Sequence, residues 1–107
     1  MSHGKVKRRA IYARDGNTCV YCQSPDNLTL DHVLSIFRGG KNAATNLITC
    51  CAPCNHERGH VRIERYLVRL GRRGLDTEAI KERIRYAVLC DIQPIIRAIE
   101  LVRAKHE

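Results

Sequence analysis

The sequence contains no tryptophan and one phenylalanine, and aromatic residues make up only 5% of its 107 residues. A core must therefore come mainly from leucine, isoleucine, valine and alanine. No apolar run reaches the roughly 18 to 20 residues that a membrane-spanning helix needs, so we expect no membrane partner. The basic N-terminus, residues 1–9, has no apolar stretch behind it, which argues against a secretory signal. A chain this short predicts a single structural domain with a modest core, which a metal site can reinforce.

Acidic residues are also few, with 11 against 19 lysines and arginines, and the formal net charge is +8. Residues 1–60 and residues 61–107 each have a net charge of +4, so the excess is not confined to a basic tail. A chain this basic commonly binds a polyanion, and nucleic acid is the leading candidate. A solvated basic surface without any partner remains the alternative.

Four of the six cysteines form two Cys-x-x-Cys pairs, Cys19 with Cys22 and Cys51 with Cys54. Without a leader segment, such pairs favour a zinc site in a reducing compartment over a disulfide framework, and we expect a cytoplasmic protein. Four thiolates complete the tetrahedral shell of Zn²⁺ and leave no open position for water. The zinc is therefore predicted to be structural. A redox-active Cys-x-x-Cys is the alternative, which two pairs in so short a chain disfavour.

The other two cysteines do not fit this spacing. Cys50 adjoins Cys51, but only Cys51 has the two-residue gap to Cys54 that lets both sulfurs reach one ion. Cys90 is predicted to be a small buried residue.

The first 60 residues predict a mixed α+β fold. A short basic helix is expected over residues 5–14, a strand over 28–33 and a second extended segment over 46–49. Pro53 suits the first turn of a helix that follows the second segment.

Residues 61–107 are predicted to be helical, because apolar residues recur there at helical spacing. A first helix is expected to end at Gly71 and Gly74, Asp76 or Thr77 can cap the next, and the last begins near Asp91. The last helix has one apolar stripe, composed of Ile92, Ile95, Ile96, Ile99 and Val102. We predict that this helical extension packs on the core or on a second subunit.

Between the two cysteine pairs lies the segment LTLDHVLSIFRGGKNAATNLITCCAPCNHERG. It contains Asp-His, then Arg-Gly-Gly, then Asn-Leu and then Cys-x-x-Cys-Asn. In this order the elements resemble the HNH endonuclease family, over about residues 14–59. The resemblance implies a ββα-metal (His-Me finger) core within residues 1–60 and a metal-dependent endonuclease that hydrolyses DNA phosphodiester bonds.

The residue types suit that chemistry. His32 can act as a general base, because an imidazole titrates near neutral pH, and the matching family histidine activates the attacking water. Asp31 offers a hard anionic oxygen that suits Mg²⁺ or Mn²⁺. By resemblance, Asp31 and Asn55 hold the catalytic cation, and Asn46 orients the loop that bears the histidine.

Basic residues near this segment are candidates for nucleic-acid binding. Arg58 occupies a position where the family often has a lysine or arginine, and it can clamp a phosphate or remain a solvated charge. Arg38 and Lys41 flank the two glycines and can contact phosphate as well. His56 and His60 are neighbours that we expect to be dispensable.

The pattern departs from the common one, since Asn55 stands where many members have histidine. DNA is the expected substrate and RNA an alternative. A different class of function is a non-catalytic, zinc-stapled nucleic-acid-binding or accessory module. The helical extension can also dock on a partner protein or form a homodimer.

Overall fold

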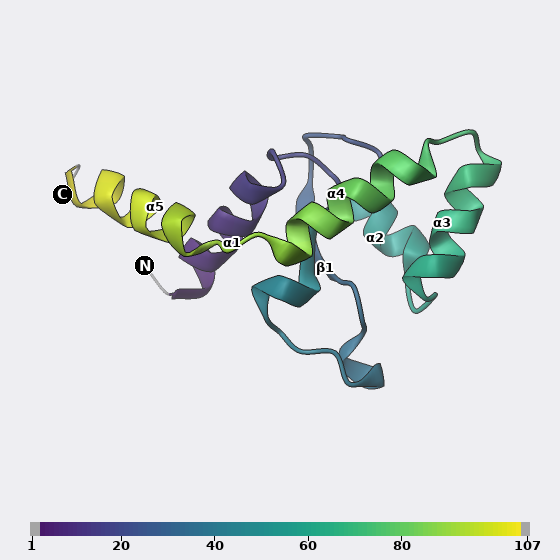
Figure 1. Cartoon of the computed structure of the whole chain (residues 1–107), viewed down its shortest axis with the longest axis horizontal. Helices are drawn as coiled ribbons and strands as arrows, with labels where there is room; N and C mark the ends of the chain where they lie inside the picture. The colour runs from purple at the N-terminus through teal and green to yellow at the C-terminus, as the bar shows by residue number, and fades with distance from the viewer. Residues whose placement is uncertain (1–2, 106–107) are drawn as a thin grey trace.

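A computed structural model describes residues 3–105 of the chain. A two-stranded sheet lies at the centre of an elongated molecule that measures 48 × 28 × 23 Å (Figure 1). The elements are α1 (His3–Arg14), β1 (Leu28–His32), η1 (Ile36–Arg38), η2 (Ala44–Asn46), β2 (Leu47–Cys51), α2 (Ala52–Arg58), α3 (Ile63–Arg72), α4 (Thr77–Leu89) and α5 (Gln93–Lys105). The predicted α+β class is confirmed.

The two strands pair antiparallel, with Asp31 opposite Ile48 and His32 opposite Leu47. All five residues of β2 are buried, so this strand forms the inner part of the sheet. β1 is half-buried except at Asp31, and its last residue, His32, lies where the chain leaves the sheet. The predicted strands are therefore present, although β2 starts one residue later than expected and continues to Cys51.

Arg14, the last residue of α1, forms a buried ion pair with Asp15, and their side-chain atoms lie 2.7 Å apart. Both residues link α1 to β2 by hydrogen bonds. The Arg14 guanidinium also donates to the Leu47 carbonyl at 2.6 Å, and the Thr49 amide donates to Asp15 at 2.8 Å. A buried charge is tolerated only when it is paired and hydrogen-bonded, and both conditions are met here. The predicted helix over 5–14 is confirmed and begins at His3.

The larger core cluster joins the cysteine-bearing loops to α3 and α4. At its centre the rings of Tyr21 and Tyr66 meet edge to face, with centroids 5.0 Å apart. Helix α3 continues through Gly71, so the prediction that it ends there is wrong. A helical glycine costs only about 1 kcal/mol, which the buried Leu70 beside it can offset. Gly74, with φ of 89°, follows the helix as expected.

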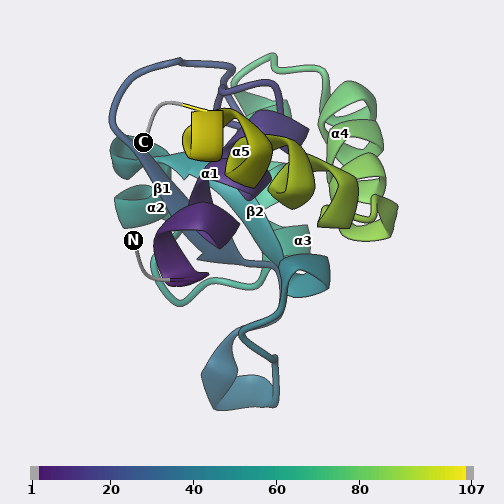
Figure 2. The ribbon, with the colours of Figure 1, turned by 90° about the vertical axis from the view of Figure 1, so that its left-hand side faces the viewer.

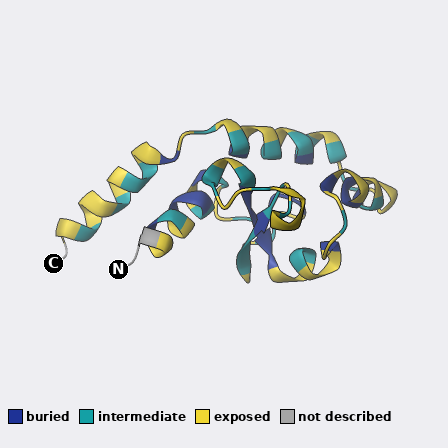
Figure 3. Cartoon of the chain, turned by 90° about the horizontal axis from the view of Figure 1, so that it is seen from below, coloured by how far each residue is buried: buried dark blue, intermediate teal, exposed yellow. Residues whose placement is uncertain are grey.

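Asp76 caps α4, because its carboxylate accepts the Ala79 amide at 3.1 Å. Helix α5 lies along α1 and contributes to a second, smaller core cluster with Ile92 (Figure 1). Only part of its predicted stripe packs, since Val102 is 57% exposed. The helix that leads to the C-terminus is largely exposed (Figure 3). Cys90 is half-buried rather than buried, and its thiol lies near the Asp91 carbonyl.

The connection between β1 and β2 projects from the body of the molecule (Figure 2). Gly39 has φ of 93°, a conformation that favours glycine. A Cβ atom at Gly40 would lie 1.8 Å from the Leu34 carbonyl oxygen, so the chain can close here only with glycine. The two glycines of the Arg-Gly-Gly sequence are thus a steric requirement of the loop. Within residues 3–105, no helix is long and apolar enough to cross a membrane.

Candidate active site

The four predicted zinc ligands converge. The sulfur atoms of Cys19, Cys22, Cys51 and Cys54 all lie within 4.8 Å of one another, and those of Cys22 and Cys51 are 3.6 Å apart. Zn–S bonds of about 2.3 Å in a tetrahedron separate the sulfurs by about 3.8 Å, so the cluster fits one zinc ion. Cys50 lies outside this group, in agreement with the prediction that Cys51 is the ligand. The cluster fastens the loop before β1 to the start of α2.

Cys50 nevertheless acts on the cluster. A hydrogen bond between its side chain and Cys19 is the main cause that lowers the pKa of Cys19 to about 4. The same bond, together with burial, raises the pKa of Cys50 far above its usual range, so Cys50 remains a thiol. A cysteine binds zinc as a thiolate, so the lowered pKa of Cys19 suits the role of a ligand, whereas burial raises the pKa of Cys51 and of Cys54.

The Asp31 carboxylate is held from one side. Its Oδ2 atom accepts a 2.9 Å hydrogen bond from the Tyr21 hydroxyl and a 2.6 Å hydrogen bond from the Arg58 guanidinium. The residue is 8% exposed. Burial, reinforced by the nearby carboxylate, raises the pKa of Tyr21 well above its usual range, so its hydroxyl remains a donor. Both bonds fall on Oδ2, so Oδ1 is the oxygen that can face a cation.

Arg58 lies at a place that the sequence did not suggest. It is 4% exposed, and its guanidinium contacts Asp31 together with the carbonyls of His32 at 2.7 Å, Val33 at 3.1 Å and Val61 at 3.0 Å. Neither predicted role, a phosphate clamp or a solvated charge, fits a buried guanidinium with four acceptors. Its physical effect is to fix Asp31 and the end of β1.

Asn55, in α2, contacts the middle of β1. Its amide nitrogen donates to the Thr29 hydroxyl at 3.0 Å and to the Leu30 carbonyl at 3.3 Å. The Thr29 hydroxyl in turn donates to the Cys50 carbonyl at 2.7 Å. Two acceptors on the nitrogen fix which end of the amide faces the strand. The Asn55 oxygen is thus the end available to a metal ion.

The loop that follows His32 is held by Asn46. The Asn46 oxygen accepts the Leu34 amide at 2.9 Å, and its nitrogen donates to the carbonyls of Leu34 at 2.8 Å and Lys41 at 2.9 Å. These bonds bring the two ends of the loop together. His32 itself is half-buried, and its Nε2 atom lies 3.3 Å from the Asn42 side-chain oxygen. A carboxamide oxygen can only accept, so Nε2 is the protonated nitrogen in this pairing.

The remaining candidates lie further out. Arg38 and Lys41 are exposed on the loop, and Arg38 donates to the His60 carbonyl at 3.3 Å. The side chains of His56 and His60 are exposed as well. The structure therefore places Asp31 and His32 at the end of β1 and Asn55 against the middle of the same strand. Asn46 braces the loop that follows.

A family model described as HNH endonuclease matches residues 19–69. This part of the chain is therefore similar to the HNH endonuclease family. The match begins at Cys19 and extends into α3, beyond Gly59, where the resemblance seen in the sequence ends. The HNH segment thus includes the cysteine cluster, both strands and α2, and it indicates a nuclease or a related nucleic-acid function. The comparison with curated proteins gives no match.

Tyr21 and Asn42 take part in this HNH site, and the sequence did not single them out. Tyr21 lies between Cys19 and Cys22, and a large side chain inside a metal-binding loop is a signal that could have marked it. Asn42 has no comparable signal, because its contact with His32 depends on the path of the loop.

Proposed function

We propose that the protein is a metal-dependent endonuclease that hydrolyses DNA phosphodiester bonds, with His32 as its general base. One divalent cation, Mg²⁺ or Mn²⁺, would be held by Asp31 and Asn55. The observation that supports this most directly is the orientation of these two side chains. Each is fixed by donors or acceptors on one of its polar atoms, and each keeps one oxygen for a hard cation.

The histidine is set up for proton transfer in the same way. With Nε2 donating to Asn42, the lone pair of His32 lies on Nδ1, which would take the proton from an attacking water. Asn42 is thus a positioning residue for His32, and Asn46 positions the loop that contains Asn42. When bound, the cation would stabilise negative charge on the phosphate and on the leaving 3′ oxygen.

Two further side chains act through Asp31. Arg58 and Tyr21 would hold its carboxylate in one orientation and balance part of its charge. Behind them, Zn²⁺ on the four cysteines would be structural, because a four-sulfur shell has no place for a substrate. Arg38 and Lys41, exposed on the loop, are proposed to contact phosphate oxygens.

The test is cleavage of supercoiled plasmid by the purified full chain with Mg²⁺, Mn²⁺ or EDTA. We expect metal-dependent cleavage that His32→Ala abolishes, because that variant has no base for the water. His56→Ala, which removes an exposed histidine of α2, serves as the matched control and should cleave normally. Unchanged cleavage by His32→Ala would contradict the assignment of the base.

A non-catalytic or accessory module is the second candidate. It is favoured by the apolar residues that α5 leaves exposed, since Leu101 and Val102 are 60% and 57% exposed. Such a surface can bind a partner protein or a second copy of the chain. Binding of plasmid without cleavage in any metal would favour this alternative. If the substrate is RNA and not DNA, the protein should cleave an RNA substrate faster than the plasmid. Paired Cys-x-x-Cys units as zinc ligands favour a reducing compartment, and we propose the cytoplasm.

A further inference from the structure

Helix α3 has two contrasting faces. The apolar face, with Ile63, Tyr66, Leu67 and Leu70, is buried in the main core cluster. Four arginines lie at spacings of three, four and three residues along the solvent side, namely Arg62, Arg65, Arg69 and Arg72. Residues at such spacings share one face of a helix. We call these four residues the arginine face.

The arginine face is largely free of internal partners. Arg69 donates to the Glu57 carbonyl at 3.4 Å, whereas the side chains of Arg62, Arg65 and Arg72 make no ion pair or hydrogen bond within residues 3–105. Other exposed arginines do find partners, as Arg73 does with Glu57 at 2.7 Å. An array of unpaired guanidinium groups on one helix is repulsive unless an anion binds it.

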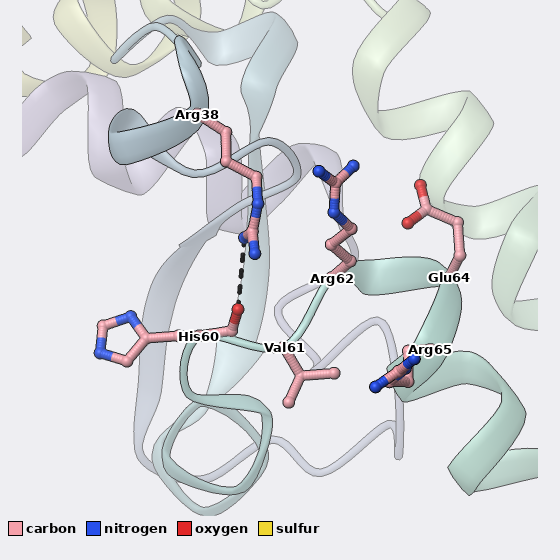
Figure 4. Close-up of a pocket in the computed structure, with 6 residues that line it drawn as sticks. All are labelled: Arg38, His60, Val61, Arg62, Glu64 and Arg65. Atoms are coloured by element: carbon pink, nitrogen blue, oxygen red, sulfur yellow. Dashed lines mark hydrogen bonds between the residues drawn. The ribbon is translucent and has the colours of Figure 1, made fainter.

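The arginine face borders two hollows in the surface. The first, of about 550 Å³, is lined by Arg38, His60, Val61, Arg62, Glu64 and Arg65 (Figure 4). Arg38 enters from the loop between the strands, opposite the start of α3, while the His60 imidazole points away (Figure 4). The second continues along α3 and includes Arg69 and Arg72. We call the two hollows, which share Glu64 and Arg65, the groove. In the first hollow Arg38 supplies a cation opposite α3 (Figure 4).

This groove adjoins the proposed active site through Arg58. One guanidinium contacts both the His32 carbonyl, at 2.7 Å, and the Val61 carbonyl, at 3.0 Å. Val61 lines the groove and His32 ends β1, so a single buried side chain separates the two. A strand whose phosphate reached His32 would therefore have its neighbouring phosphates close to α3.

We propose that the arginine face, with Arg38 on the opposite wall, binds the phosphate backbone of duplex DNA and places the duplex across the active site. This rests on the proposed nuclease function and extends it to the region outside the catalytic residues. From Arg62 to Arg72 the helix rises about 15 Å, the length of about four base pairs of duplex. Guanidinium groups bind phosphate oxygens through two hydrogen bonds at once, whatever the base sequence.

Glu64 provides a test in which DNA affinity is expected to rise and not to fall. Its carboxylate lines both hollows and lies among the arginines. A negative charge there repels phosphate, so Glu64→Gln should tighten binding of DNA. A surface that bound an amine or a basic peptide would respond to Glu64→Gln in the opposite direction.

The experiment measures binding of a labelled 20-base-pair duplex to the full chain with His32→Ala, by fluorescence anisotropy at several salt concentrations. In that background, Arg62, Arg65 and Arg72 are changed together to glutamine. The matched control changes Lys5, Arg8 and Arg9 to glutamine; these are exposed on α1, at the opposite end of the molecule (Figure 1). Both variants lose three positive charges.

We expect the α3 variant to bind at least about tenfold more weakly and to lower the slope of log K against log salt by about 3, one for each phosphate contact. The control should change the slope by less than 1. Two duplexes of unrelated sequence should give the same loss. An equal loss in both variants, or a loss confined to one sequence, would overturn the proposal.

Binding and cleavage give independent results. If the wild-type chain fails to cut DNA but the α3 variant still loses affinity selectively, the result supports DNA binding by the arginine face and contradicts the nuclease proposal. If the wild-type chain cuts DNA and the α3 variant binds DNA like its parent, the result contradicts DNA binding by the arginine face and leaves the nuclease proposal supported.

Discussion

The proposed site depends on side chains that orient the proposed metal ligand and the proposed base by hydrogen bonds. Tyr21 and Arg58 both bond Asp31 Oδ2, and Asn42 bonds His32 Nε2. The contacts of such residues cannot be assigned from the sequence, since nothing in a single chain shows which polar groups will be buried together. The Asp-His, Asn-Leu and Cys-x-x-Cys-Asn elements located the site, but the placement of Arg58 required the fold.

Tyr21 gives the prediction at this scale. Tyr21→Phe removes a buried hydrogen bond to a carboxylate, so at neutral pH it should lower the free energy of unfolding by about 1.5 to 3 kcal/mol. The pKa of Tyr21 is raised in the folded state, whereas the unfolded side chain titrates near pH 10. The contribution of Tyr21 is therefore complete below pH 10 and is lost as the pH rises above that value.

The measurement is denaturant unfolding of both proteins at about pH 7 and about pH 11. The difference in stability between wild type and Tyr21→Phe should shrink at the higher pH. Tyr12→Phe is the matched control, since the Tyr12 hydroxyl donates only to the Leu28 carbonyl, and its cost at pH 7 should be near 1 kcal/mol. A difference for Tyr21→Phe that stays constant with pH would contradict this account.

At the scale of elements, most boundaries followed from local signals. Pro53 in the first turn of α2, Asp76 at the cap of α4 and the basic helix α1 were all predictable. Gly71 was not, because tertiary packing outweighs a weak helix propensity. The apolar stripe of α5 was misjudged for a related reason, since periodicity shows which face is apolar and not how much of it finds a partner.

The loop between the strands can be tested at Gly40. Gly40→Ala would place a carbon against the Leu34 carbonyl, so the backbone must move and Asn42 must shift relative to His32. We expect DNA cleavage to fall by about 100-fold, as for other displacements of about 1 Å at active sites. Zinc content should be unchanged, because the four cysteines lie outside the loop.

Thr45→Ala, an exposed position in the same connection, controls for a general effect of changes in the loop. Plasmid cleavage rates and zinc content of the two variants show whether the geometry of the loop affects catalysis. Equal cleavage by Gly40→Ala and wild type would show that the loop geometry is not needed for catalysis.

At the scale of the whole molecule, stability is expected to depend on the metal. A chain of 107 residues buries a limited share of its surface. The cysteine cluster lies at the edge of the main core cluster, with Cys19 and Cys51 buried and Cys22 exposed. The paired Cys-x-x-Cys spacing predicted this arrangement fully, because two-residue gaps and four sulfurs are direct requirements of zinc geometry.

Cys22→Ala should therefore remove most of the stability of the domain, since zinc binding and folding are coupled in such sites. Cys90→Ala is the control, because Cys90 lies outside the cluster and is only half-buried. Thermal unfolding followed by circular dichroism, with zinc content measured in parallel, gives the comparison. A normal melting temperature for Cys22→Ala would refute the structural role.

A zinc ion bound by the four cysteines would also change the connectivity of the polypeptide. Cys22 and Cys51 are 29 residues apart, and a metal bridging them would close a ring that contains Asp31, His32 and Asn46. Such a ring restricts the unfolded chain as a crosslink does. A protease cut at Arg38 or Lys41 would then leave two fragments still joined through the ion and the paired strands. The exposed loop with Arg38 and Lys41 is thus the part of the site where a cut in the backbone would disturb the fold least.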